Sequence, residues 1–333
     1  MSELVSIIIP CYNGEAYIDK AIQSVYEQEC PAIELIVVDD GSTDASAEAI
    51  LAWQDRFEEK GHIFKYIYQE NKGLGGAINT GLKHVTGEFL SLLDADDEYL
   101  PGAVAERVAY LRDHPDVGVV RSNGWIEKGG NRRLFVTDER EKLCEDIFVP
   151  LLRGETNNWA GSYMVRTAQL FAFYPEREIY TSRYGQNLQL LMPLAYQKPC
   201  GFIDKTLMRY IQRDNSLSQT ADAAIAKERS IENLAGYRDI RVYMLRQIVK
   251  DTAQVEQYMK HINGAYWRQM LYLANYYQDK ILLRSAYEKL RDSECPRLDD
   301  RIVYFRAVYP PFALLLRVWR KLGIILGKSC DNS

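Results

Sequence analysis

In the segment 89-FLSLLDADDEYLP-101, an apolar run leads directly into a cluster of acidic residues. Its apolar start predicts a buried strand. Asp94, Asp96 and Asp97 come directly after that strand. Three like charges repel one another unless a positive charge lies among them or water surrounds them. The rest of the sequence has to explain which group neutralises these aspartates.

The first 125 residues alternate short apolar runs with amphipathic segments, and this alternation predicts the fold class. The apolar runs predict strands at residues 5–10, 33–40, 64–69, 88–95 and 117–126. The segments between them predict helices at 14–28, at 41–57 with Thr43 or Asp44 as N-cap, at 75–85, and after Pro101. Such alternation is typical of α/β proteins, in which a mostly parallel sheet carries helices on both faces.

Polar residues come after three of these strands. The first strand ends in PCYN (10–13), the second in DDGS (39–42), and the fourth in DADD (94–97). In an open α/β sheet, ligands bind beyond the carboxyl ends of the strands. We therefore expect the three clusters to gather at one edge of the sheet and to form a binding site there.

The spacing of the aspartates in 94–97 suits a hard divalent cation. Mg²⁺ or Mn²⁺ binds one or two carboxylates and completes its coordination with phosphate oxygens and water, so a cation with a diphosphate would relieve the repulsion. A helix-loop-helix calcium loop that began at Asp94 would need glycine where Tyr99 stands. The segment 71–81 (NKGLGGAINTG) has Ile78 in place of the third glycine of a dinucleotide-binding loop, and it lacks the Gly-Lys-Ser/Thr of a Walker A loop.

The composition is that of a folded protein of ordinary charge. The chain has 333 residues, of which 47% are hydrophobic and 26% charged, and its net charge is −5 at pH 7. This acidic balance gives no reason to expect a nucleic-acid partner. The cysteines show no metal-ligand spacing, which predicts free thiols in a reducing compartment. Since the N-terminus lacks the basic start of a signal peptide and no run reaches 18 apolar residues, we expect a cytoplasmic protein.

The pattern changes twice after residue 125. Residues 126–220 are less regular and complete a first domain that we place at 1–220, whereas helical periodicity predicts a helical subdomain over 221–300. Residues 301–333 form a basic amphipathic tail, with six basic residues and no acidic one between 301 and 328. A helix from Phe312 to Leu326 is too short and too charged to span a membrane, but it suits an anionic membrane surface. The alternative is a terminal helix that docks on the protein's own core.

Four segments, in this order, resemble the family 2 glycosyltransferases: VSIIIPCYNGEAYIDKAIQSVYEQ (5–28), ELIVVDDGSTD (34–44), NKGLGGAINTGL (71–82) and LLDADDEYLPG (92–102). The resemblance is close over residues 5–125 and looser over 155–220. It implies a GT-A fold, a Rossmann-like sheet in which residues 1–125 bind the nucleotide sugar and residues 126–220 the acceptor. It also implies an inverting transfer that depends on Mn²⁺ or Mg²⁺.

The resemblance gives roles to residues at the ends of the first two strands. Pro10 and Tyr12 would line the base pocket, with the tyrosine ring stacked on the nucleobase. Asn13 would shape the adjoining turn. Asp40 would accept a hydrogen bond from the base, most often uracil. These positions imply a nucleotide-sugar donor, and a UDP-sugar before any other.

The resemblance also covers the glycine-rich segment and the aspartate cluster. Gly73 and Asn79 would lie in the segment that closes over the nucleotide. Asp94 and Asp96 would belong to the nucleotide-sugar site, and Asp96 and Asp97 would bind the metal that bridges the diphosphate. A cation at that place neutralises the charge that develops on a nucleoside diphosphate as it leaves.

The sequence departs from the family in two places. Ile78 stands where the family motif often has arginine, so one phosphate contact is missing. The acceptor loop of inverting members usually carries Glu-Asp, and its Asp removes the proton of the acceptor hydroxyl. The matching positions in 183–196 (RYGQNLQLLMPLAY) are Gln186 and Asn187, whose amides are not general bases near neutral pH. Either Glu176, Glu178 or a donor phosphate takes the proton, or the two amides hold acceptor hydroxyls while another group does so.

One further segment and one missing signature bear on the reaction. The segment 210–220 (YIQRDNSLSQT) resembles a family loop from which Arg213 would reach the diphosphate. The Q-x-x-R-W signature of processive synthases is absent from the sequence, which favours transfer of single sugar residues.

The sequence thus predicts a transferase that moves a sugar from a nucleotide sugar to a glycan acceptor in cell-surface polysaccharide synthesis. The basic tail suggests a lipid-linked acceptor and a peripheral position on the cytoplasmic face of the inner membrane. The alternative is a non-catalytic nucleotide-sugar-binding or assembly protein that has lost its catalytic base. A nucleotidyltransferase fits less well, because the PCYNGEAYI segment (10–18) lacks the glycine-rich basic loop that binds a triphosphate.

Overall fold

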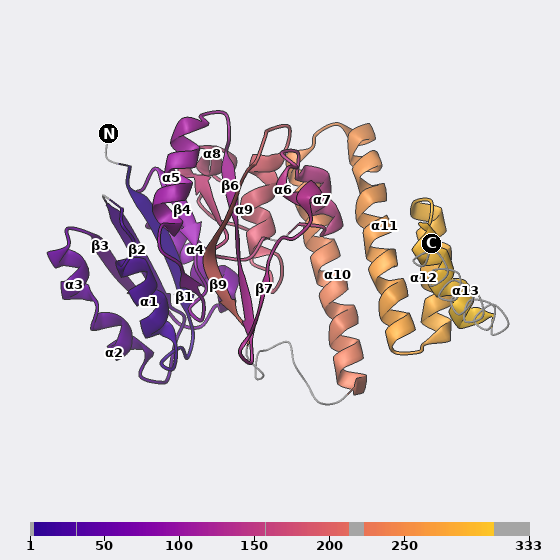
Figure 1. Cartoon of the computed structure of the whole chain (residues 1–333), viewed down its shortest axis with the longest axis horizontal. Helices are drawn as coiled ribbons and strands as arrows, with labels where there is room; N and C mark the ends of the chain where they lie inside the picture. Colours follow the sequence, from indigo (N-terminus) through magenta and orange to yellow (C-terminus); the bar gives the residue numbers. More distant parts are fainter. Residues whose placement is uncertain (1–2, 31, 157, 213–222, 310–333) are drawn as a thin grey trace, which may run out of the picture. The chain divides into compact units, whose positions relative to one another are not determined.

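The computed structural model describes residues 3–30, 32–156, 158–212 and 223–309 (Figure 1). The chain divides into two compact units, residues 1–219 and 220–333. Two features singled out in the sequence, Arg213 and the amphipathic segment from Phe312 to Leu326, lie outside the described residues.

The first unit is built on one sheet, whose strands are separated widely in the sequence. Its described strands are β1 (Val5–Cys11), β2 (Ile33–Asp39), β3 (Ile63–Tyr68), β4 (Phe89–Leu92), β5 (Glu98–Tyr99), β6 (Val119–Lys128), β7 (Asn131–Leu134), β8 (Tyr163–Arg166) and β9 (Gly201–Ile211). Their order is β3-β2-β1-β4-β8-β6-β9-β5, and β7 pairs with β6.

The sheet is parallel on one side and mixed on the other. β3, β2, β1 and β4 all run in the same direction. β8 then lies antiparallel between β4 and β6, β9 runs parallel to β6, and β5 runs antiparallel to β9. The sequence-based expectation of a mostly parallel sheet is right for β1 to β4 and for β6 and β9, which all run in one direction, and wrong for β8, β5 and β7, which run in the opposite direction.

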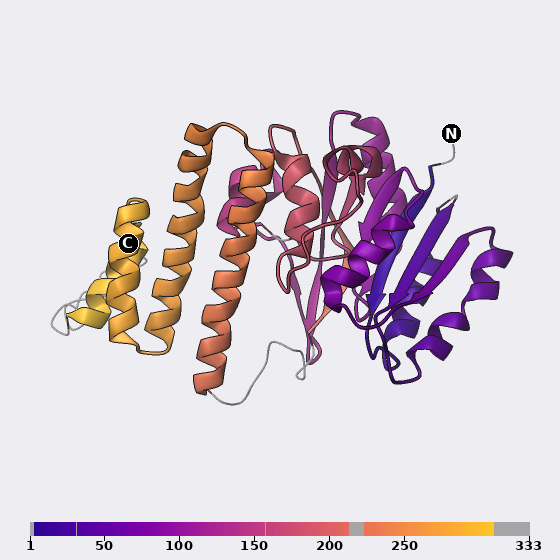
Figure 2. The ribbon, with the colours of Figure 1, turned by 180° about the vertical axis from the view of Figure 1, so that it is seen from behind.

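Helices cover both faces of this sheet. The described helices of the first unit are α1 (Ile18–Tyr26), α2 (Ser46–Leu51), α3 (Gln54–Glu59), α4 (Gly73–Lys83), α5 (Ala103–Asp113), α6 (Glu139–Lys142), α7 (Phe148–Arg153), α8 (Thr167–Phe173) and α9 (Gln186–Ala195). α1 and α5 lie on the face seen in Figure 1, and α4 and α9 lie on the face seen in Figure 2.

Alternating side chains of the buried strands supply the two cores. Ile7 and Ile9 of β1 belong to the cluster that includes Ile18 and Ile22 of α1. The intervening Ile8 points to the other face, where a Cβ atom on Gly81 of α4 would lie 2.7 Å from it. A strand that is buried on both faces reads as a continuous apolar run, which is why the first strands were recognisable in the sequence.

The single helix predicted over residues 41–57 needs correction. Residues 41–57 form two short helices, α2 and α3, and α2 begins after Ala45 with no side-chain cap. The N-cap position is occupied by Ala45, and Asp44, one residue earlier, accepts the N–H groups of Glu15 and Ser46, each at 3.1 Å. Asp44 therefore joins the loop after β2 to the loop after β1.

The second unit is helical throughout its described residues. Its helices are α10 (Ala223–Ile248), α11 (Thr252–Tyr276), α12 (Lys280–Ser293) and α13 (Leu298–Val308). Leu271, Leu283 and Leu290 are buried between α11 and α12, and Tyr287 stacks on Tyr304 of α13 with ring centroids 3.9 Å apart. Among the described residues, no helix combines the length and apolarity that crossing a membrane requires.

Candidate functional site

The three polar clusters of the sequence lie at one edge of the sheet. In the parallel register, Cys11 of β1 pairs with Asp39 of β2, and Ile8 of β1 pairs with Leu92 of β4. The carboxyl ends of these strands therefore meet, and the N–H of Asp40 donates to the carbonyl of Cys11 at 2.8 Å. The sequence-based placement of the clusters is confirmed.

Asp39 and Asp40 are held by hydrogen bonds from neighbouring loops. The carboxylate of Asp39 accepts the hydroxyl of Tyr66 at 2.9 Å and the N–H of Ser42 at 2.8 Å. Asp40 is 3% exposed, and it accepts the side-chain amide of Gln69 at 2.5 Å and the N–H of Lys72 at 2.8 Å. Each buried charge thus has protein donors, as buried carboxylates require.

The turn after β1 presents an aromatic ring. Asn13 has φ +50°, a left-handed conformation that asparagine tolerates. Its N–H donates to the hydroxyl of Ser42 at 2.9 Å, and its side-chain oxygen accepts the N–H of Thr43 at 2.8 Å. With the turn held in this way, Pro10 is buried and the ring of Tyr12 is 52% exposed. The exposed ring follows Cys11, whose carbonyl accepts the N–H of Asp40, and it is available for stacking.

The glycine-rich segment begins α4 and packs against the loop before α9. Gly73 has φ +72° with no atom within 4 Å of where a Cβ would stand, so its backbone faces open space. A Cβ on Gly75 would lie 3.4 Å from the carbonyl oxygen of Ser182. The side-chain amide of Asn79 donates to the carbonyl of Ile179 at 3.0 Å and accepts its N–H at 2.8 Å. Asn79 therefore fixes the loop that leads to α9.

The aspartate cluster holds two partly exposed carboxylates and one buried carboxylate. Asp94 and Asp96 are half-buried. Burial, and then the negative charge of Asp96, raise the pKa of Asp94 above its usual range. Asp97 is fully buried, and its carboxylate accepts the N–H of Ile211, the last residue of β9, at 3.0 Å. Asp97 therefore ties β9 to the end of β4.

The paired carboxylates fit a hard divalent cation. Within the described residues no three acidic, histidine or cysteine side chains gather as a metal cage. Mg²⁺ and Mn²⁺ need only one or two carboxylates when phosphates and water supply the other ligands. Asp94 and Asp96 provide such a pair, and a cation between them would remove the repulsion that raises the pKa of Asp94.

The Gln186–Asn187 pair opens α9 and reaches the aspartate cluster through a tyrosine. Gln186 is buried, and its amide donates to the carbonyl of Ser182 at 2.7 Å. The hydroxyl of Tyr163, on β8, donates to the side-chain oxygen of Asn187 at 2.7 Å. Burial, and then the charge of Asp94, raise the pKa of Tyr163 well above its usual range, so the phenol keeps its proton. Tyr163 therefore lies between the aspartate cluster and Asn187.

The two glutamates considered as substitute bases do not lie at this edge. Glu178 forms an ion pair with Lys83 at 2.5 Å, and the guanidinium of Arg177 donates to the carbonyl of Val85. Lys83 ends α4, which runs back from the carboxyl edge for about 16 Å. Glu178 thus lies toward the amino edge, and Glu176, two residues away, is too near to Glu178 to reach the aspartates.

The structure also describes Ile78 and two site residues that the sequence did not predict. Ile78, at the place where the family often has arginine, is 2% exposed and packs in the core. Tyr163 and the backbone of Ile211 were not expected as parts of the site. Tyr163 begins the four-residue strand β8 and Ile211 ends the eleven-residue strand β9, and strand pairing brings them to the aspartates.

Curated relatives match part of the chain. An uncharacterized glycosyltransferase of Rickettsia typhi, RT0329, is 38% identical over 157 residues, which cover 45% of this chain and 47% of that protein. Glycosyltransferase GlyG of Streptococcus pneumoniae is 26% identical over 66% of this chain and 74% of its own length. In comparisons such as that with RT0329, the chain spans about half the length of the curated relatives that it matches.

Solved structures match over most of the chain. TarS of S. aureus (residues 1–349), in complex with UDP-GlcNAc, superposes with a TM-score of 0.58 at 19% identity and covers 90% of each chain. The mannosyltransferase PcManGT from Pyrobaculum calidifontis, in complex with GDP-Man and Mn²⁺, gives a TM-score of 0.55 at 18% identity over 96% of this chain and 80% of that one. At such identities the likeness concerns the fold, which is GT-A.

The part of the chain that matches the family model also holds the site. Residues 6–171 match the model of glycosyl transferase family 2, a range that includes the strand ends at Asp40 and Asp96 and the tyrosine at position 163. Through these residues the chain belongs to glycosyl transferase family 2, with a GT-A sheet followed by a helical region.

Proposed function

We propose that this protein transfers a sugar from a nucleotide sugar, a UDP-sugar in the first place, to a glycan acceptor. The observation that carries the proposal is the convergence of three features at one sheet edge. They are the hydrogen-bonded Asp40 beside the exposed ring of Tyr12, the carboxylates of Asp94 and Asp96, and the Tyr163–Asn187 pair. This arrangement offers a place for a base, a cation with a diphosphate, and an acceptor hydroxyl.

Each part of the site has a separate task in this proposal. Tyr12 stacks on the nucleobase and Asp40 accepts a hydrogen bond from it. Asp94 and Asp96 hold Mn²⁺ or Mg²⁺, which supplies charge neutralisation to the departing diphosphate. Asp97 is a further ligand on the family pattern, and its described contact with Ile211 gives it the added task of fixing β9.

Asn187 acts as a hydrogen-bond donor to a substrate oxygen, not as a base. Its side-chain oxygen is engaged by Tyr163, and within the described residues its amide NH₂ has no hydrogen-bond partner. An amide in this orientation can donate to an acceptor hydroxyl or to the donor sugar. The proton of the acceptor hydroxyl then passes to a phosphate oxygen of the donor, since the two glutamates lie toward the other edge.

The acceptor and the place of reaction rest on the sequence. The basic residues between 301 and 328 favour an acceptor carried on a membrane lipid, with the protein peripheral at the cytoplasmic face of the inner membrane in cell-surface polysaccharide synthesis. An inverting outcome rests on the family pattern. The alternative, a nucleotide-sugar-binding or assembly protein without catalysis, is favoured by the amide at position 187.

Donor turnover tests the proposal. The purified protein is incubated with Mn²⁺ and a panel of nucleotide sugars, and release of nucleoside diphosphate is measured with and without a lipid-linked glycan extract. We expect metal-dependent release from one donor and its loss in Asp96→Asn, which keeps the size of a partly exposed side chain. Nucleotide binding without any release, even with the extract, would favour the binding protein.

A further inference from the structure

We propose that a pocket between α10 and α11 of the helical unit binds a neutral sugar residue of the acceptor glycan. The two helices lie side by side (Figure 1 and Figure 2), and the pocket has a volume of about 590 Å³. α10 supplies Ser230, Asn233 and Leu234 to its lining, and α11 supplies Arg268, Gln269, Tyr272 and Leu273. This inference rests on the proposed transferase function and gives the acceptor a second place of contact.

The lining residues share one face of each helix. Those of α10 are spaced i, i+3 and i+4, and Gln269, Tyr272 and Leu273 of α11 have the same spacing. Residues at this spacing are neighbours on the surface of a helix. The pocket therefore lies where these two faces meet, over about one turn of each helix.

Contacts on both sides of the pocket hold α10 against its neighbours. One turn before the lining residues of α10, Lys227 forms an ion pair at 2.7 Å with Asp279, which caps α12. One turn after them, the guanidinium of Arg238 donates to the side-chain oxygen of Asn263, on α11, at 3.2 Å. The folded unit thus contains the pocket without a ligand in it.

The single charged residue among the described lining residues is neutralised by neighbours. Arg268 donates to the carboxylate of Asp300 at 3.0 Å and forms an ion pair with Glu294. Burial, and then the negative charges of Asp300 and Asp299, raise the pKa of Tyr272, so its phenol stays neutral. A nucleotide sugar carries a charged diphosphate, which such a lining does not attract. The pocket suits the acceptor instead.

Two amides of the lining are available to a ligand. Across the described ranges of the chain, the side chains of Asn233 and Gln269 make no hydrogen bond. An amide offers both donors and an acceptor, and a sugar hydroxyl also donates and accepts, so the two groups match. A few polar groups of this kind are what fixes the orientation of a ligand in a pocket.

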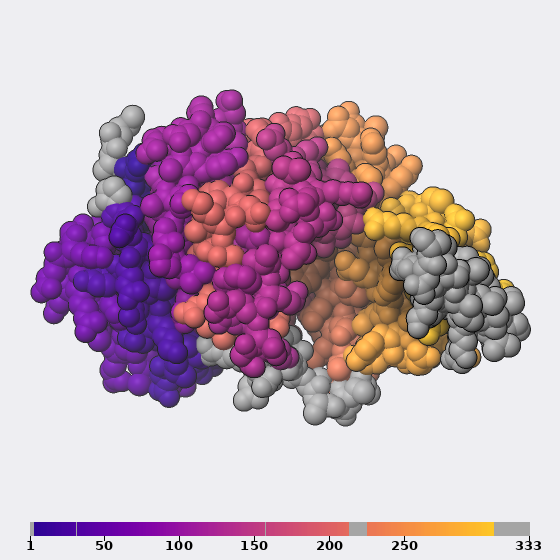
Figure 3. Space-filling model, in the orientation of Figure 1, coloured from indigo at the N-terminus to yellow at the C-terminus, as the bar shows by residue number. Residues whose placement is uncertain are grey.

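Tyr272 adds an apolar surface beside these amides. It is 40% exposed, and Leu234 and Leu273 line the pocket with it. Side chains of α11, drawn in orange, reach the molecular surface in Figure 3. A sugar ring has a face of C–H groups and a rim of hydroxyls, so it can pack on an aromatic ring while amides bind its rim. Pockets that hold small ligands have volumes of about 300–1,000 Å³, a range that includes this one.

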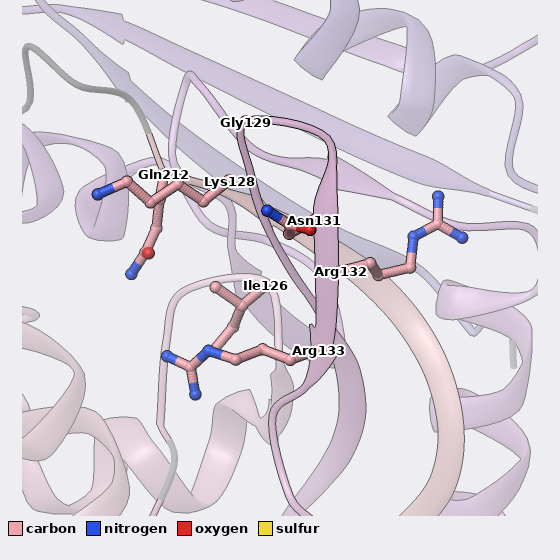
Figure 4. Close-up of a pocket in the computed structure, with 7 residues that line it drawn as sticks. All are labelled: Ile126, Lys128, Gly129, Asn131, Arg132, Arg133 and Gln212. Atoms are coloured by element: carbon pink, nitrogen blue, oxygen red, sulfur yellow. The ribbon is translucent and has the colours of Figure 1, made fainter.

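A pocket of the first unit has a different lining. Beside the β6–β7 hairpin, a pocket of about 430 Å³ is lined in part by Lys128, Arg132 and Arg133 (Figure 4). The hairpin pocket is thus rich in basic side chains, whereas the polar side chains of the pocket in the helical unit are mostly neutral. This contrast supports an uncharged ligand for the helical unit.

Direct binding, without turnover, tests this inference. The whole protein is titrated, in the absence of nucleotide, with neutral tetrasaccharides: cellotetraose, chitotetraose, mannotetraose and maltotetraose. We expect at least one of them to bind, with an affinity that added salt leaves unchanged, because the contacts are not ionic. Absence of binding by all of them, or binding that weakens as salt rises, would overturn the proposal.

Matched variants locate the binding. Tyr272→Ala and Gln269→Ala should each weaken binding of the preferred tetrasaccharide at least about fivefold. Tyr243→Ala removes a tyrosine of similar exposure, 39%, about 15 Å along α10 from Asn233, and it should change the affinity less than twofold. Since the amide of Gln269 makes no hydrogen bond within the described residues, Gln269→Ala should leave the unfolding temperature unchanged. Equal losses in Tyr272→Ala and Tyr243→Ala, or full affinity in Gln269→Ala, would contradict a site at this pocket.

Binding of UDP with Mn²⁺ separates this inference from the transferase function. Each variant should bind UDP as the unaltered protein does, because the substituted residues are not among those at the sheet edge. UDP binding without binding of any tetrasaccharide would contradict the pocket alone. Absence of UDP binding in the unaltered protein would count against the transferase function itself.

Discussion

The two acidic clusters at the carboxyl edge differ in how their charge is compensated. Asp40 and its neighbour at the end of β2 accept hydrogen bonds from Gln69, Lys72 and other groups of the protein. Asp94 and Asp96 lie together at the end of β4, where burial, and then the charge of Asp96, raise the pKa of Asp94. The first cluster is complete within the protein, so it shapes a pocket. In the second, two carboxylates lie close enough for one to raise the pKa of the other, and we propose it as the place of the cation.

The largest expected effect comes from removing charge in the second cluster. Asp96→Asn should lower donor turnover by at least about 100-fold, because a cation that stabilises a leaving diphosphate supplies several kcal/mol. Chelation of divalent cations should produce the same loss in the unaltered protein. Release of nucleoside diphosphate at unchanged rate in either experiment would contradict the role given to this cluster.

Removing charge in the first cluster should instead lower stability. Asp40→Ala leaves the buried amide of Gln69 and the partly buried N–H of Lys72 without this acceptor, which costs about 2 kcal/mol of unfolding free energy. Asp96→Asn serves as the contrast, because it should leave stability unchanged or raise it in the absence of a cation. Urea unfolding of the two variants measures both effects, and equal destabilisation would remove the distinction between the clusters.

Glu34 of β2 is a third carboxylate that accepts hydrogen bonds within the protein, and its contribution to stability should depend on pH. Burial raises the pKa of Glu34, but hydrogen bonds from Lys65, Ser6 and Thr86 outweigh it and hold that pKa below its usual range. A carboxylate with a lowered pKa contributes stability above the ordinary pKa of glutamate, and this stability is lost as pH falls through the lower, folded value. We expect Glu34→Gln to cost about 1.5 kcal/mol at pH 7. The difference from the unaltered protein should vanish below about pH 3.

Unfolding by urea at several pH values measures the Glu34 effect. Thr86→Val, which removes one of the hydrogen bonds and keeps the charge, is the control and should leave most of the pH dependence in place. A Glu34→Gln effect that stayed constant between pH 3 and pH 7 would show that the loss is one of packing, not of charge.

The smallest effect concerns the link between the second cluster and α9. Tyr163→Phe and Asn187→Ala each remove the hydrogen bond between these side chains, so each should reduce donor turnover about fivefold, as expected for one neutral hydrogen bond. Combining them should add little, because both changes break the same interaction. Independent, multiplicative losses in the double variant would show that the two residues act separately.

The sequence predicted the parallel side of the sheet better than the mixed side. β1 and β2 are buried on both faces, and α4 has a regular apolar stripe, so local pattern was enough to place Asp40 and Asp94 at one edge. β8 and β9 reach the same edge by pairing with residues far away in the chain. The contacts of Tyr163 with Asn187 and of Ile211 with Asp97 depend on that pairing, and no local pattern reveals it.

The measurement that tests the cation site most directly is thermal unfolding with UDP and Mn²⁺, added singly and together, for the unaltered protein and Asp96→Asn. A ligand that binds the folded state raises the unfolding temperature, and tighter binding raises it further. We predict that UDP with Mn²⁺ raises it by more than the sum of the two separate shifts, and that Asp96→Asn loses this excess. A shift with UDP alone that Mn²⁺ does not increase would contradict a cation site at Asp94 and Asp96.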